Sequence, residues 1–140
     1  MAFDFWTVVG SCSIVDRSDV EAALTDVENR LRALDLEGLV AFQGHLAVEL
    51  EALNLGSLAS IPIELPSGAV FDQTEDHFLY ARCACLLSGR ASAHEVISDP
   101  GQFSVFVAPR LQSAETLLYL ARNEYRRRTG ESMKGVRTPE

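Results

Sequence analysis

Residues 74–100, TEDHFLYARCACLLSGRASAHEVISDP, decide the fold of this chain. Thr74 is a suitable N-cap, and the acidic side chains directly after it favour the positive end of a helix. In the segment Phe78–Leu87 the one charged side chain is Arg82. A helix that is apolar nearly all round is normally buried at the centre of a domain, and Gly89 is well placed to end it. The stretch therefore predicts a buried central helix.

A second helix is predicted shortly after this glycine. Ser92 and Glu95 have the spacing of a capping box, in which the serine and the glutamate satisfy each other's backbone amides. The pair Asp99-Pro100 ends the pattern, since proline cannot continue a helix. We therefore expect a short helix between Ser92 and Asp99.

Two longer amphipathic helices are predicted before this stretch. Ser18 and Glu21 form another capping-box match, and apolar residues follow at helical spacing as far as Leu34. Asp35 can cap the next helix, which extends over Leu36–Leu53. Because the break between the two helices is short, we expect an antiparallel helical hairpin.

The pattern changes between residues 54 and 73. Pro62 and Pro66 disfavour a helix, and the residues around them are typical of extended chain. A small β-hairpin near residues 60–72 and an ordered loop both fit this segment. Pro62 would confine any strand to an edge or a bulge.

The two ends of the chain complete the predicted fold. Residues 4–12 predict a short helix, and residues 110–129 predict a long helix whose apolar residues share one face and which Gly130 ends. We expect residues 1–130 to form a single compact all-α domain of five or six helices, with room for the small hairpin. Residues 131–140 are expected to form a flexible tail.

The charge of the chain is negative and unevenly distributed. The 140 residues carry a net charge of −8, and residues 1–109 hold 16 acidic and 5 basic side chains, a balance of −11. Such a surface repels phosphate, which disfavours nucleic acid as a partner. No apolar run approaches the roughly 20 residues that span a bilayer, so we expect no membrane partner. The odd number of cysteines and the lack of a signal-peptide pattern favour a cytoplasmic protein with reduced thiols.

Several short motifs along the chain together resemble those of a known family. They are Phe5-Trp6, the acidic pair Glu75-Asp76 followed by Phe78 and Arg82, Gly89-Arg90, Asp99-Pro100, Leu117-Leu118-Tyr119, and Thr129-Gly130-Glu131. In order and spacing these motifs resemble a bacterial family, the domain of unknown function 4240. Residues 55–72 depart from it, because many members have a glycine-containing helical segment there. The resemblance implies a mostly helical fold in a bacterial cytosolic protein, and it implies no reaction, substrate or cofactor.

Arg82 and Arg90 are the basic side chains on which a binding site could be built. A guanidinium inside an apolar helix is costly to bury without an acceptor. Asp76, Asp99 or the C-terminus of another helix could supply this acceptor in a structural ion pair or cap. Alternatively, Arg82 could clamp a carboxylate or phosphate, with Arg90 as the second arm. The candidate binding residues are therefore Asp76, Arg82, Arg90 and Asp99.

The sequence contains no motif for a metal, a cofactor or catalysis. Cys83 and Cys85 are two apart and point to different faces of a helix, and together with His77 and His94 they lack zinc-site spacing. Neither a phosphate-binding loop nor a dinucleotide fingerprint nor a nucleophile elbow occurs. We therefore expect no catalytic residue, no metal ligand and no cofactor.

Three functions stay open on the sequence. The acidic balance and the lack of a catalytic constellation favour a non-enzymatic domain that binds a basic surface on another protein, as small acidic immunity proteins do. The alternative is a small-molecule or anion-binding protein, or a minor enzyme, that uses Arg82 and Arg90. The third is a homodimer whose contact is Phe5, Trp6 or the stretch Ile61–Phe71.

Overall fold

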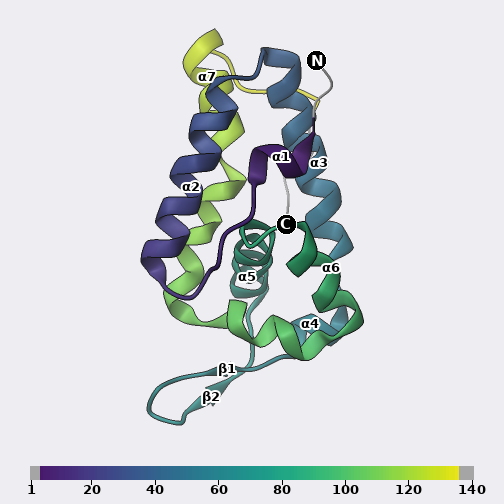
Figure 1. Ribbon diagram of the computed structural model, residues 1–140, viewed down its shortest axis with the longest axis vertical. Helices are drawn as coiled ribbons and strands as arrows, with labels where there is room; N and C mark the ends of the chain where they lie inside the picture. Colours follow the sequence, from purple (N-terminus) through teal and green to yellow (C-terminus); the bar gives the residue numbers. More distant parts are fainter. Residues whose placement is uncertain (1–3, 136–140) are drawn as a thin grey trace.

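The computed structural model describes residues 4–135 and is built around one buried helix (Figure 1). This helix, α5 (Glu75–Leu87), is the central helix predicted from the sequence, and ten of its 13 residues are buried. The hydroxyl of Thr74 accepts a hydrogen bond from the backbone amide of His77 at 3.1 Å, as an N-cap does. The apolar run therefore lies where its composition requires, inside the domain.

The other elements surround α5. In chain order the described residues form α1 (Phe5–Val9), α2 (Arg17–Arg32), α3 (Leu36–Ala52), α4 (Gly56–Ala59), β1 (Ile63–Glu64), β2 (Val70–Phe71), α5, α6 (Arg90–Ser98), the 3₁₀-helices η1 (Pro100–Val107) and η2 (Pro109–Leu118), and α7 (Leu120–Thr129). Helices α2, α3 and α6 and both 3₁₀-helices pack on α5. The structure confirms an all-α fold with one small β-hairpin.

Helices α2 and α3 run in opposite directions, as the short break between them predicts (Figure 1). Both helices pack on α1 and on α7. The carboxylate of Asp35 accepts the amide of Gly38 at 2.7 Å, which confirms Asp35 as the N-cap of α3. The side chain of Phe5 in α1 is 1% exposed and stacks on Phe42 of α3, with 5.1 Å between ring centroids. Helix α1 is thus anchored to the core by its aromatic pair.

The helix starts differ from two of the sequence predictions. Asp16, rather than Ser18, caps α2, because the Asp16 carboxylate accepts the amide of Asp19 at 3.1 Å and the Asp19 carboxylate accepts the amide of Asp16 at 3.1 Å. Helix α6 begins at Arg90 without a side-chain cap, so the capping box at Ser92 was wrong. A serine followed three residues later by an acidic residue is common in polar segments. Such a pair caps a helix only where the backbone enters the helix at the serine.

The hairpin, one of the two options for residues 60–72, projects from one end of the molecule (Figure 1). The amide of Gly68 donates to the carbonyl of Leu65, and the amide of Leu65 donates to the carbonyl of Ala69, each at 2.9 Å. This pattern is a type I turn followed by a bulge residue in the left-handed region. Gly68 occupies that position with a φ of +88°, which explains the Pro-Ser-Gly sequence at the turn.

The long C-terminal helix predicted over residues 110–129 is two helices in the structure. The prediction of one continuous α-helix was wrong. The 3₁₀-helix η2 is followed at Leu120 by α7, which ends at Thr129 before Gly130 as expected. Four buried apolar residues are spaced by three, Leu111, Ala114, Leu117 and Leu120, and Leu118 and Ala121 are buried beside them. Spacing by three suits the 3₁₀-helix, with about three residues per turn, better than the α-helix.

The structure leaves the expected domain boundaries untested. Residues 136–140 of the predicted tail lie outside the described residues. Within the described part of that tail, Met133 is 6% exposed and belongs to the hydrophobic core cluster. The core therefore includes a contact from beyond the end of α7.

Candidate functional site

Arg82 lies in the interior of the molecule and is 3% exposed. Its Nη1 donates a 2.8 Å hydrogen bond to the carbonyl of Leu50 in the last turn of α3, and its guanidinium carbon lies 4.4 Å from the ring centroid of Phe78. Burial lowers the pKa of Arg82, and the charge of Glu51 opposes this effect. These contacts are those of a cation that caps the carboxyl end of a neighbouring helix, one of the roles left open by the sequence.

The four binding residues predicted from the sequence occupy separate positions. Asp76 is exposed in the first turn of α5, and Arg82 lies further along the same helix by about 9 Å, at about 1.5 Å per residue. Arg90 and Asp99 are exposed at opposite ends of α6. The carboxylate of Asp99 accepts a hydrogen bond from Gln102 at 3.2 Å. Because α6 separates Arg90 from Asp99 and Arg82 bonds a backbone carbonyl, we build no anion clamp on these residues.

Acidic side chains gather where the hairpin meets α5. Asp72 directly follows β2, and the N-cap at Thr74 places Glu75 and Asp76 in the first turn of α5. The 3₁₀-helix η2 packs on α5 and contributes Glu115. We call Asp72, Glu75, Asp76 and Glu115 the acidic surface.

Within residues 4–135, no cation forms a salt bridge with the acidic surface. Five salt bridges occur among the described residues, and none of them includes a carboxylate of the acidic surface. Its members are exposed, apart from the half-buried Glu115. The negative charge is therefore directed to the solvent, where a cation from another molecule can reach it.

Tyr80 joins α5 to η2 within this surface. A hydrogen bond to Glu115 raises the pKa of Tyr80 to about 12, with burial and the charges of Glu115 and Asp76 as further causes. The phenol therefore stays protonated at neutral pH. Two aromatic side chains close to these acids in the sequence are exposed, Phe71 with 55% of its surface and Tyr119 with 44%.

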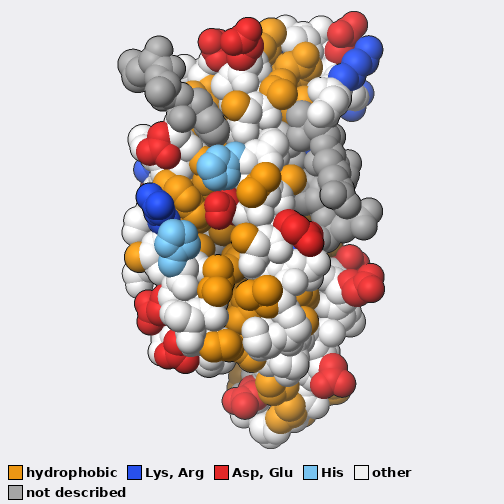
Figure 2. Space-filling model, turned by 90° about the vertical axis from the view of Figure 1, so that its right-hand side faces the viewer, with side chains coloured by type: hydrophobic (Ala, Val, Ile, Leu, Met, Phe, Trp, Pro, Cys, Tyr) orange, Lys and Arg blue, Asp and Glu red, His pale blue; other side chains and the backbone are white. Residues whose placement is uncertain are grey.

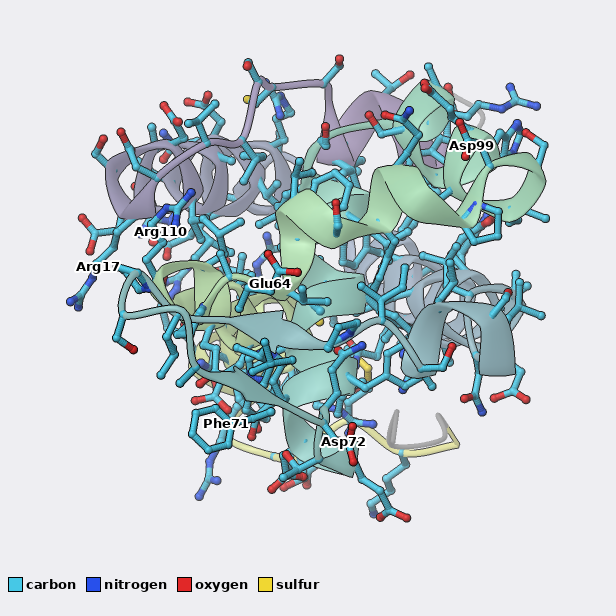
Figure 3. The ribbon with its side chains drawn as sticks, turned by 90° about the horizontal axis from the view of Figure 1, so that it is seen from below. Arg17, Glu64, Phe71, Asp72, Asp99 and Arg110 are labelled. Atoms are coloured by element: carbon cyan, nitrogen blue, oxygen red, sulfur yellow. The ribbon has the colours of Figure 1, made fainter. Side chains whose placement is uncertain are left out.

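Carboxylates with aromatic rings beside them form a favourable environment for lysine and arginine side chains. The carboxylates accept charge-assisted hydrogen bonds, and the ring faces attract the cation. Figure 3 labels Phe71 at the end of β2 and Asp72 directly after it, with the two side chains drawn apart from each other. The arrangement is suited to binding a cation.

The side of the molecule formed by α3, α4 and α6 has a different character. Figure 2 shows hydrophobic side chains spread over this side, with acidic side chains and histidines among them. Val48 in α3 is 64% exposed, and Ile97 in α6 is 45% exposed. The charges here are dispersed, so this side lacks the concentrated negative potential of the acidic surface.

His77 and the cysteines of α5 are core residues. The Nε2 of His77 donates to the carbonyl of Val107 at 2.7 Å, which leaves Nδ1 to accept from the amide of Gln112. Cys83 and Cys85 are buried, and burial raises the pKa of each thiol to about 12. In residues 4–135 no group of three or more His, Cys, Asp or Glu side chains could hold a metal ion.

The sequence identifies the acidic surface only in part. Asp76 is a sequence candidate, but as a partner for Arg82. Glu115 is missed, because nothing in the sequence shows that η2 packs beside the first turns of α5. The available signal is the density of acids around the N-cap, with three acidic side chains in residues 72–76.

Comparison with known proteins identifies the family of the chain. No helix in the described residues has both the length and the apolar character that crossing a membrane requires. No curated protein and no solved structure matches the chain. The family described as "Protein of unknown function (DUF4240)" matches residues 2–127, which is most of the 140-residue chain. The chain therefore belongs to the DUF4240 family.

Proposed function

We propose that this protein is a non-enzymatic interaction domain whose acidic surface binds a basic surface on another protein. The observation that carries the proposal is the group of four carboxylates that form no salt bridge with the described residues. The net charge of −8 supports it, because long-range attraction speeds the encounter with a basic partner.

The local chemistry favours arginine-rich partner surfaces. A planar guanidinium can bond a carboxylate through two parallel hydrogen bonds and can stack on an aromatic ring. Glu75 and Asp76 supply carboxylates, and Phe71 and Tyr119 supply exposed rings. An interface of this kind pairs an aromatic centre with a charged rim, as in many non-obligate complexes.

The proposal places the protein in the cytoplasm. Its three cysteines, Cys12, Cys83 and Cys85, are free. A reducing compartment keeps thiols in this state, and burial protects the two in α5 from reaction as thiolates. The function resembles that of an immunity protein, in which an acidic domain covers a basic surface on its target.

The test compares two triple variants of equal charge. In one, three acids of the acidic surface are neutralised: Asp72→Asn, Glu75→Gln and Asp76→Asn. In the control, three exposed acids elsewhere are neutralised: Asp26→Asn, Glu37→Gln and Glu95→Gln. Both variants change the net charge from −8 to −5, because each loses three negative charges. Partners are captured from the lysate of the protein's own host, identified by mass spectrometry and titrated at several salt concentrations.

We expect the wild type and the control to retain the same basic protein, with an affinity that falls steeply as salt rises. The acidic-surface variant should lose at least about tenfold in affinity, or about 1.4 kcal/mol. Equal affinities of the two variants for that partner would show that only the overall charge matters. A partner that is not basic, or whose binding is insensitive to salt, would overturn the proposal.

A further inference from the structure

A cleft of about 500 Å³ lies on the β1 side of the hairpin. Its walls come from three segments that are far apart in the chain: the loop after α1 with Val15, the run into β1 with Ile61 and Pro62, and η1 with Val105. Val15 and Val105 are 59% and 54% exposed although they are apolar. Burying these side chains under an occupant would stabilise the complex, so the walls favour apolar groups.

The cleft also contains a free strand edge. Glu64 lies opposite Val70, next to the position where the amide of Leu65 bonds the carbonyl of Ala69. In an antiparallel ladder such a residue directs its N–H and C=O away from the partner strand, since hydrogen-bonded and non-bonded pairs alternate. Outside the β1–β2 ladder, neither group has a backbone hydrogen-bond partner in the described part of the chain. Glu64 lines the cleft, so this edge is available to a strand that enters it.

Charge distinguishes the two ends of the cleft. Figure 3 shows Glu64 on the hairpin and Arg110 towards α2. The Nε of Arg110 donates to the carbonyl of Val15 at 2.9 Å, which holds the guanidinium on the wall. Arg110 forms no salt bridge with a described carboxylate. The pKa of the nearby Asp16 is lowered first by its hydrogen bond from Ser18 and last by the charge of Arg110. The terminal nitrogens of Arg110 can therefore receive a carboxylate from an occupant.

We propose that this cleft binds an extended segment of a partner protein, which adds to β1 as a third strand and pairs an acidic side chain with Arg110. Main-chain hydrogen bonds to Glu64 hold the segment, and its alternate apolar side chains lie against Val15, Val105 and Ile61. Charge complementarity favours a segment that has an acidic side chain near Arg110 and no acidic side chain near Glu64. This site is independent of the acidic surface, which attracts cations on the β2 side of the hairpin.

The first test selects peptides from a display library of random short segments against three proteins. Wild type should select alternating apolar residues with one acidic position, and the Arg110→Glu variant should select a basic residue at that position. The control is Arg17→Glu, an equal charge change at an exposed side chain near the cleft (Figure 3), and it should retain the wild-type preference. Circular dichroism confirms that both variants are folded.

The second test uses the wild type alone, so it does not depend on the folding of a variant. Hydrogen exchange at the amide of Glu64 should slow when a selected peptide binds, because the amide gains an acceptor. A peptide that is N-methylated on the residues facing β1 should lose at least about tenfold in affinity.

Three results would overturn the proposal. They are the selection of no peptide, a consensus whose acidic position does not respond to Arg110→Glu, and unchanged exchange at Glu64 in the complex. A fourth result would come from sedimentation. It would be a dimer of this chain that dissociates in the Arg110→Glu variant and forms again in the double variant Arg110→Glu and Glu64→Arg. In that case the occupant is a second copy.

Discussion

At the scale of single residues, arginine side chains close the carboxyl ends of three helices. Arg30 bonds the last carbonyls of α1, Arg82 bonds a carbonyl in the last turn of α3, and Arg128 bonds three carbonyls at the end of α2. Helix ends leave carbonyls without partners and carry a partial negative charge. A guanidinium satisfies several of them at once because it offers several donors in a fixed plane. These three arginines therefore have structural roles.

Arg82 gives the sharpest test of this role. We expect Arg82→Met to destabilise the fold by about 1–3 kcal/mol, because the carbonyl of Leu50 loses a buried charge-assisted hydrogen bond. Arg90→Met is the control, since Arg90 is exposed at the start of α6, and it should change stability by less than about 0.5 kcal/mol. Urea unfolding measures both. If the two variants had equal stability, the capping role of Arg82 would be wrong.

At the scale of elements, two residues, Ser88 and Gly89, join α5 to α6. Gly89 has a φ of +112°, a conformation that L side chains rarely adopt. A Cβ atom on Gly89 would also lie 3.0 Å from the Cβ of Ser11 and 3.2 Å from its Cα. The loop after α1 therefore lies directly on the α5–α6 turn, and this contact requires glycine.

Two glycine-to-alanine substitutions should have opposite effects. Gly89→Ala combines a left-handed backbone with a contact to the main chain of Ser11, and we expect a loss of about 2–4 kcal/mol. Gly44→Ala is the matched control within α3, where an added Cβ meets nothing within 4 Å. Alanine favours the helix there, and we expect a gain of up to about 1 kcal/mol. Thermal and urea unfolding measure the loss and the gain of stability. An unchanged stability of the Gly89→Ala variant would disprove the close contact.

At the scale of the whole molecule, Glu124 ties α7 to α2. Glu124 is 6% exposed, and its carboxylate accepts hydrogen bonds from Arg127 and Arg128. These contacts, with Arg127 first, lower the pKa of Glu124 to about 2 from its ordinary value of 4.5. Arg128 in turn bonds the carbonyls at the end of α2. The two helices are thus joined through one buried acid.

This junction should make stability depend on acid pH. The folded state favours the Glu124 carboxylate, so its contribution is complete above about pH 4.5 and is lost as the pH falls towards 2. At neutral pH, Glu124→Gln should destabilise by about 1–3 kcal/mol, and the difference from wild type should vanish near pH 2. Glu21→Gln, which removes an exposed pair with Arg17, is the control and should be nearly neutral. A Glu124→Gln effect that is independent of pH would contradict the assignment.

The sequence by itself determined the fold class and much of the secondary structure. The apolar run of α5 and the caps at Thr74 and Asp35 depend on interactions within a few residues, which a local pattern records. The family resemblance was confirmed by a match over residues 2–127.

Only the tertiary structure decided what the charged side chains contact. Arg82 could have paired with an acid, capped a helix or bound an anion, and the packing of α5 against α3 placed the Leu50 carbonyl within its reach. Glu115 joined the acidic surface because η2 lies beside α5. Such contacts depend on which elements meet, and that choice comes from burying apolar area across the whole chain, which no local pattern encodes.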